Sequence, residues 1–117
     1  MKTLSQKSHV HGHKVVVNKR GVKFCYLSSK VTTTGGGTYL TRALAARAET
    51  EADVLVFMIP GGPNAERNRE RIMRGRDDLM SAVKPLILPF KIVVMIGTNQ
   101  SLAENYFSTM AWSDVKY

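Results

Sequence analysis

Three largely apolar runs dominate the hydrophobicity pattern of this chain. They are Val22–Leu27, Val54–Ile59 and Lys91–Ile96, and a Ser, Pro or Gly residue follows each of them. Runs without regular polar alternation are typical of strands that are covered on both faces, as in a parallel sheet between helices. The pattern therefore predicts a short, mostly parallel sheet.

The segments between and after these runs have helical periodicity. The predicted helices are Thr38–Ala48, Asn64–Leu86 and Ser101–Met110. Their first residues are of the types that favour N-caps, and Glu104 stands at the capping-box position of the third segment. Each helix would cover the sheet through its apolar stripe.

This order of strands and helices predicts an α/β fold, a three-layer sandwich in which helices flank the sheet. A chain of 117 residues is long enough for one domain, so residues 1–117 are predicted to form a single one, with a flexible segment at residues 1–13. Val15–Val17 leaves two alternatives open. It is either a strand that pairs with Val22–Leu27 through a hairpin, or part of a helix.

Composition narrows the class of protein. Hydrophobic residues make up 44% of the chain, which argues against disorder throughout. The one cysteine, Cys25, cannot form an intramolecular disulfide and is expected to be buried in its apolar run. Because the sequence has no signal-peptide core and no apolar stretch long enough to span a bilayer, we expect an intracellular protein, cytoplasmic or nuclear, without a membrane span.

The positive charge suggests polyanionic partners. The chain has 17 Lys and Arg against 9 Asp and Glu, a formal charge of +8. Arg67, Arg71 and Arg74 are spaced to lie on one helical face. They are either a stripe that contacts RNA or DNA phosphates or a solvent-exposed face in which Glu66, Glu70 and Asp78 neutralise arginines. Further candidate phosphate contacts are Lys19, Arg20 and Lys30.

Three loops should meet at the carboxyl ends of the predicted strands, where open α/β sheets bind ligands. They are Ser28–Gly37, Pro60–Asn64 and Gly97–Ser101, all rich in Gly, Ser, Thr or Asn. Gly35, Gly36 and Gly37 precede a predicted helix and could expose backbone amides to an anion. The alternative is that this first loop is only a mobile connection.

The amino-terminal segment contains His9, His11 and His13. In a single strand these side chains would project from one face and could share a transition metal. The alternative is a frayed terminus with solvated imidazoles. No cofactor is predicted.

The middle of the chain resembles the SGNH (GDSL-type) hydrolase family. The resemblance rests on a strand, a glycine loop at Gly35–Gly37, a helix, and a strand followed by Gly62-Pro63-Asn64, and it extends over Gly21–Ile96. It implies an SGNH-like or flavodoxin-like sheet with Gly36 and Asn64 as oxyanion-hole donors. Gly97-Thr98-Asn99 is a second match to the Gly-x-Asn motif.

The catalytic part of that family's pattern is missing. There is no Gly-Asp-Ser block and no carboxyl-terminal Asp-x-x-His, and Ser8 is the only candidate nucleophile by this resemblance. The sequence therefore favours a non-catalytic, degenerate member of this fold that binds RNA or DNA through its basic surface. The alternatives are a small esterase or acyl hydrolase that uses Ser8, and a structural partner protein that forms a homodimer.

Overall fold

Five strands form one mixed sheet in the order β1-β2-β3-β4-β5. The computed structural model describes residues 8–10, 13–28 and 36–116. The strands are β1 (Ser8–Val10), β2 (His13–Val17), β3 (Lys23–Ser28), β4 (Val54–Ile59) and β5 (Lys91–Ile96). The three predicted apolar runs are thus strands, and β3, β4 and β5 pair in parallel.

The sheet is mixed rather than mostly parallel because a hairpin extends it beyond β3. Val15–Val17 belongs to β2, which pairs antiparallel with β3, with Val15 opposite Cys25 and Val17 opposite Lys23. This confirms the strand alternative for Val15–Val17 and excludes the helical one. Strand β1 pairs antiparallel with β2 and forms the edge of the sheet.

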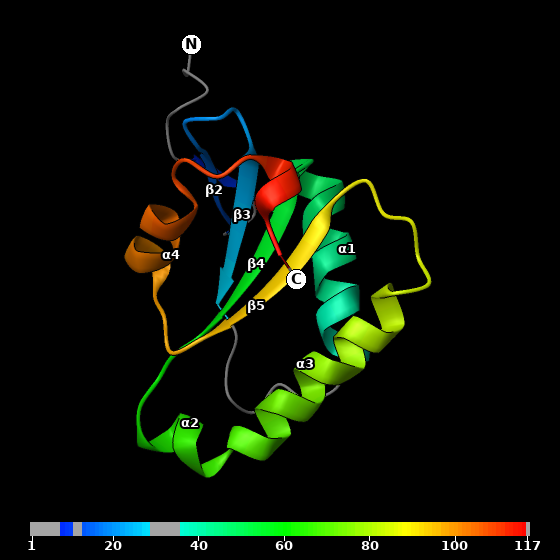
Figure 1. Ribbon diagram of the computed structural model, residues 1–117, viewed down its shortest axis with the longest axis vertical. Coiled ribbons are helices and arrows are strands. Elements are labelled where there is room, and N and C mark those ends of the chain that lie inside the picture. Colours follow the sequence, from blue (N-terminus) through cyan, green and yellow to red (C-terminus); the bar gives the residue numbers. More distant parts are fainter. Residues whose placement is uncertain (1–7, 11–12, 29–35, 117) are drawn as a thin grey trace.

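Helices flank both faces of this sheet (Figure 1). On one face, α1 (Gly36–Thr50) and α3 (Arg69–Val83) pack over a core that includes Tyr39 and Leu79. On the other face, α4 (Gln100–Phe107) packs through Ala103 and Phe107. The short helix α2 (Pro63–Arg67) precedes α3, and the 3-10 helix η1 (Trp112–Asp114) lies near the carboxyl terminus.

The predicted helix Asn64–Leu86 is in fact two helices that meet at Asn68 and end at Val83. The backbone of Asn68 has φ −109° and ψ 17°, and its side-chain amide donates to the Asn64 carbonyl at 2.8 Å. An asparagine side chain that competes for a helix carbonyl weakens the regular ladder. The prediction of one continuous helix was therefore wrong at this residue.

The predicted N-caps were also wrong, each by a short shift along the chain. Gly62, with φ 110°, precedes α2, and Pro63 fills the first helical position in place of a side-chain cap from Asn64. In α4 the cap is Asn99, whose side-chain oxygen accepts from the Leu102 N–H at 2.9 Å, and Ser101 lies inside the helix. Helix α1 begins at Gly36, before Thr38.

The sheet centre is fully buried. Cys25, Phe57 and Leu55 have no exposed surface, which confirms the expected burial of the cysteine. Burial raises the pKa of the Cys25 thiol from 9.0 to about 11, against a weaker opposing effect of its hydrogen bond with Thr50. Within the part of the chain that the structure describes, no helix combines the length and the hydrophobicity needed to cross a membrane.

Candidate functional site

Glycine-containing loops follow β4 and β5 at neighbouring points of the sheet edge. The Gly97 N–H donates to the Ile59 carbonyl at 2.7 Å, which holds the start of one loop against the end of β4. Gly61 lies so close that an added Cβ would come within 3.3 Å of the Gly97 Cα atom. The two loops therefore expose backbone, with little side chain, at this edge.

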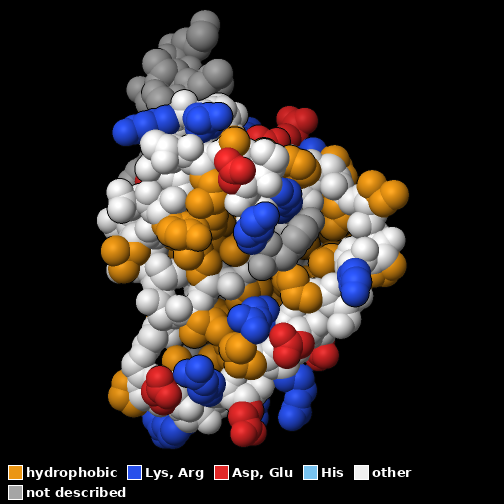
Figure 2. All heavy atoms as spheres, in the orientation of Figure 1, with side chains coloured by type: hydrophobic (Ala, Val, Ile, Leu, Met, Phe, Trp, Pro, Cys, Tyr) orange, Lys and Arg blue, Asp and Glu red, His pale blue; other side chains and the backbone are white. Residues whose placement is uncertain are grey.

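Beside these loops lies a cavity of about 410 Å³ between the sheet edge and the α2–α3 segment. We call it the glycine cavity. Its lining includes Gly61, Gly62 and Gly97 from the loops, and it also includes charged and apolar side chains from the helices, among them Glu66, Arg69, Ile72, Met73 and Arg76. In Figure 2, hydrophobic side chains lie between basic and acidic ones in this lower part of the molecule.

A second concavity, of about 510 Å³, lies on the outer side of the junction between α2 and α3. We call it the arginine hollow. Three of its lining residues are the arginines of the predicted stripe, Arg67, Arg71 and Arg74. The structure therefore brings these three side chains to one surface, although Arg67 comes from α2 and the other two from α3. Arg69 and Glu66 line both the hollow and the glycine cavity.

The carboxylates of this segment do not neutralise those arginines. In the described residues, the ion pair of the α2–α3 segment is Arg76–Asp77, at 3.6 Å. The alternative predicted from the sequence required Glu66–Arg69, Glu70–Arg74 and Arg74–Asp78 pairs, and none of these forms within 4.0 Å. Glu66 and Glu70 also line the arginine hollow, but the exposed Arg67, Arg71 and Arg74 form no ion pair with them in the described part of the chain.

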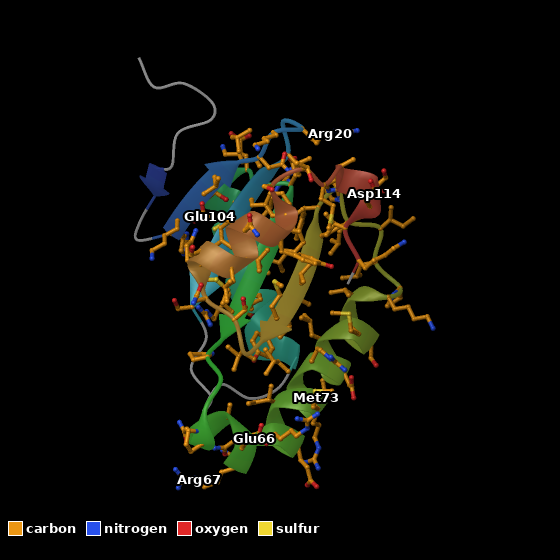
Figure 3. All side chains as sticks on the ribbon, turned by 60° about the vertical axis from the view of Figure 1, so that its left-hand side comes forward. Arg20, Glu66, Arg67, Met73, Glu104 and Asp114 are labelled. Carbon is orange, nitrogen blue, oxygen red and sulfur yellow. The ribbon has the colours of Figure 1, made fainter. Side chains whose placement is uncertain are left out.

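The other predicted basic residues lie elsewhere. Lys19 and Arg20 occupy the turn between β2 and β3, at the end of the molecule opposite to α2 (Figure 3). The molecule is 44 Å long, and Figure 1 shows this turn at the top and α2 at the bottom of that axis. Lys30 and Gly35 lie outside the described residues, while Gly36 and Gly37 form the start of α1.

The hydrolase candidates are not brought together. Ser8 begins β1, and its register across the sheet passes through Val15 and Cys25 to Leu55, the second residue of β4. Strands lie about 4.8 Å apart, so three strand spacings place Ser8 roughly 14 Å from β4, and Asn64 lies beyond the far end of that strand. Asn64 is exposed, and its side-chain oxygen faces the Asn68 amide at 3.4 Å.

The histidines do not follow one another along a single strand. His9 is in β1 and His13 in β2, and the register pairs His9 with Lys14 and Val10 with His13. His11 lies outside the described residues. The His13 Nδ1 atom is 3.3 Å from a carboxylate oxygen of Glu49. Among the described side chains, no group of three or more His, Cys, Asp or Glu is arranged to hold a metal ion.

Arg69 and Arg76 were not among the residues that the sequence singled out as candidate ligand contacts. The structure places both on the wall of the glycine cavity, where they face the loops after β4 and β5. A signal was present, since the i, i+7 spacing of these two arginines sets them on one face of a helix, with Ile72 and Met73 between them. What the sequence did not supply was the position of that face against the sheet edge.

Comparisons with known proteins do not assign this chain to a family. No family model, no curated protein and no solved structure matches this chain.

Proposed function

We propose that this protein is a non-catalytic binding module that contacts the phosphates of RNA or DNA with the arginine hollow. The observation that carries the proposal is the convergence of Arg67, Arg71 and Arg74 on one concave surface, where the neighbouring Glu66 and Glu70 form no ion pair with them in the described structure. Guanidinium groups bind phosphate oxygens in a planar, bidentate manner, and they remain charged at every physiological pH.

The local charge supports this proposal. Residues 67–76 contain five arginines and a single carboxylate, that of Glu70, in the sequence RNRERIMRGR. The same stretch is exposed along its outer face, where Arg67, Glu70, Arg71 and Arg74 all lie in solvent. Figure 3 shows Arg67 at the lower tip of the molecule, pointing away from the sheet. A concentrated cationic surface of this kind raises both the affinity and the association rate for a polyanion.

The remaining features fit a binding module better than a hydrolase. A serine nucleophile requires a base and an oxyanion hole within hydrogen-bond reach, and the register separates Ser8 from Asn64 by most of the sheet. In the proposal the fold is a three-layer, SGNH-like sandwich without the catalytic residues. The strand order of the described sheet is sequential, so the sheet has no point where the strand order reverses, which is where open α/β sheets usually bind ligands. The proposal therefore assigns the ligand contacts to the helices beside the carboxyl ends of the strands.

The test is a charge-matched comparison of two triple variants. One variant carries Arg67→Gln, Arg71→Gln and Arg74→Gln. The control carries Lys19→Gln, Arg20→Gln and Lys84→Gln, which remove the same net charge from exposed positions outside the hollow. Fluorescence anisotropy with labelled single-stranded RNA and duplex DNA, measured across a salt series, gives the affinity and its salt dependence for each protein.

The hollow variant should bind at least tenfold more weakly, with a salt slope reduced by about 2 units for single strands, because each lost phosphate contact removes about 0.7 unit. The control should retain most of the wild-type slope. Equal losses in the two variants would show that only net charge matters and would contradict the proposed site.

A further inference from the structure

The glycine cavity has walls of two kinds. The α2–α3 segment supplies both kinds, with the charged Arg69, Arg76 and Glu66 beside the apolar Ile72 and Met73, and β5 adds the apolar Ile96. Its volume of about 410 Å³ falls in the range of small-molecule sites, which combine apolar walls with a few converging polar groups. The composition of the walls indicates what such a molecule would contain.

The charged wall suits a phosphate group. Arg69 and Arg76 are seven residues apart on α3, two helical turns, and their side chains line the same cavity. Among the described residues, Arg76 forms an ion pair with the exposed Asp77 carboxylate at 3.6 Å. Surface pairs of this type contribute little and are screened by salt, so a doubly charged phosphate would displace Asp77 readily.

The loops contribute backbone donors to the same cavity. Gly61 and Gly62 both line the cavity, and their N–H groups donate to no atom within the described part of the chain. Gly62 has φ 110° and Gly97 has φ 77°, conformations that residues with a Cβ rarely adopt. Without side chains at these positions, a ligand oxygen can approach the amides closely.

The apolar wall suits a flat ring. Ile96 ends β5 with 41% of its surface exposed, an unusual position for a large apolar side chain at the end of a buried strand. Met73, on the facing side of α3, is half-buried, and its flexible thioether adapts to ring faces. Figure 3 labels Glu66 on α2 and Met73 on the neighbouring part of α3, and both line the glycine cavity. The Glu66 carboxylate can accept from a hydroxyl or an amino group of the ligand.

We propose that the glycine cavity binds a nucleoside monophosphate, with the phosphate at Arg69 and Arg76 and the base against Met73 and Ile96. This ligand combines the three chemistries of the walls: a dianion, hydroxyl or amino donors, and a planar ring. The inference does not rest on the proposed nucleic-acid contacts, since Arg67, Arg71 and Arg74 do not line the glycine cavity, although Arg69 and Glu66 line both concavities.

Isothermal titration calorimetry with adenosine monophosphate, adenosine and inorganic phosphate tests the inference. The test variant is Arg69→Gln with Arg76→Gln, and the matched control is Lys84→Gln with Lys116→Gln, which removes two charges from exposed positions outside both the glycine cavity and the arginine hollow. Circular dichroism melts of both variants verify folding. The nucleotide should bind wild type at least tenfold more tightly than either fragment alone, and the test variant should lose at least tenfold while the control keeps wild-type affinity.

In nature this ligand chemistry could come from a free nucleotide or from the terminal nucleotide of a strand. Two trinucleotides, one with a 5′-phosphate and one with a 5′-hydroxyl, distinguish these sources. A trinucleotide with a 5′-phosphate that binds more tightly than adenosine monophosphate, and more tightly than the same trinucleotide with a 5′-hydroxyl, identifies a strand end. Preference for the free nucleotide identifies a small molecule. Three results overturn the inference: no nucleotide binding at millimolar concentration, equal binding of inorganic phosphate, or an equal loss in the control variant.

Discussion

Asn18 joins the β2–β3 hairpin to the carboxyl-terminal end of α4, and its removal is a quantitative test of the fold. Its side-chain oxygen accepts from the N–H groups of Arg20 and Val22 at 2.9 and 3.0 Å. Its side-chain amide donates to the carbonyls of Phe107 and Met110 at 2.7 and 2.8 Å. One side chain thus fixes a turn and anchors a segment about 90 residues away in sequence.

The Asn18→Ala variant loses all four hydrogen bonds. At about 1 kcal/mol of net stabilisation each, with some replacement by water at this half-buried position, we expect a loss of about 3 kcal/mol in the free energy of unfolding. The loss should appear in urea denaturation as a lower midpoint at an unchanged m-value. In a thermal melt it should lower Tm by about 10 °C.

Two companion variants make the result specific. Asn18→Asp keeps the acceptor for Arg20 and Val22 but turns a second oxygen toward two carbonyls, so it should also lose at least about 2 kcal/mol. Asn105→Ala, on the exposed side of α4, should change stability by less than about 0.5 kcal/mol. A loss below about 1 kcal/mol in Asn18→Ala, or a near-neutral Asn18→Asp, would refute the assigned link between hairpin and α4.

Three other features give independent predictions. The raised pKa of Cys25 keeps the native thiol protonated at a pH where the unfolded thiol ionises. The free energy of unfolding should therefore fall as pH rises from about 9 to 11, by up to about 1.4 kcal/mol per pH unit. Urea titrations at each pH should show a smaller slope for Cys25→Ala. The native thiol should also resist iodoacetamide at pH 8 until urea unfolds the chain. Asn99→Ala should cost about 1 kcal/mol in urea denaturation, since it removes the cap bond to Leu102. Trp112→Phe should lower stability by about 1 kcal/mol in the same assay, because it deletes the 3.0 Å bond from the indole N–H to the Asp53 carbonyl but keeps a ring over Lys91.

The strands could be predicted because their signals are local. Valine-rich and aromatic runs such as Val54–Ile59 favour strands whatever their partners, and each run was long enough to be distinct. The hairpin of Val15–Val17 remained one of two alternatives. What decided it is the pairing of Val15 with Cys25, together with Gly21 at φ 77° in the turn.

Helix ends and the site were harder to predict for physical reasons. The Arg- and Glu-rich sequence around Asn68 has strong helix propensity on both sides, so its pattern does not mark the break, where the Asn68 side-chain amide and backbone N–H both donate to the Asn64 carbonyl. The stripe of Arg67, Arg71 and Arg74 was visible as a spacing. The glycine cavity was not, because it depends on how α3 crosses the ends of β4 and β5.

The most direct test of the central claim is a titration of the ¹⁵N-labelled protein with a short single-stranded RNA, followed by backbone amide chemical shifts. The proposed phosphate contacts predict progressive shifts at residues 67–74, which salt reverses, with residues 18–22 of the β2–β3 turn unaffected. An unchanged spectrum at low salt, or shifts confined to the turn and its Lys19 and Arg20, would contradict the assignment of the arginine hollow as the nucleic-acid interface.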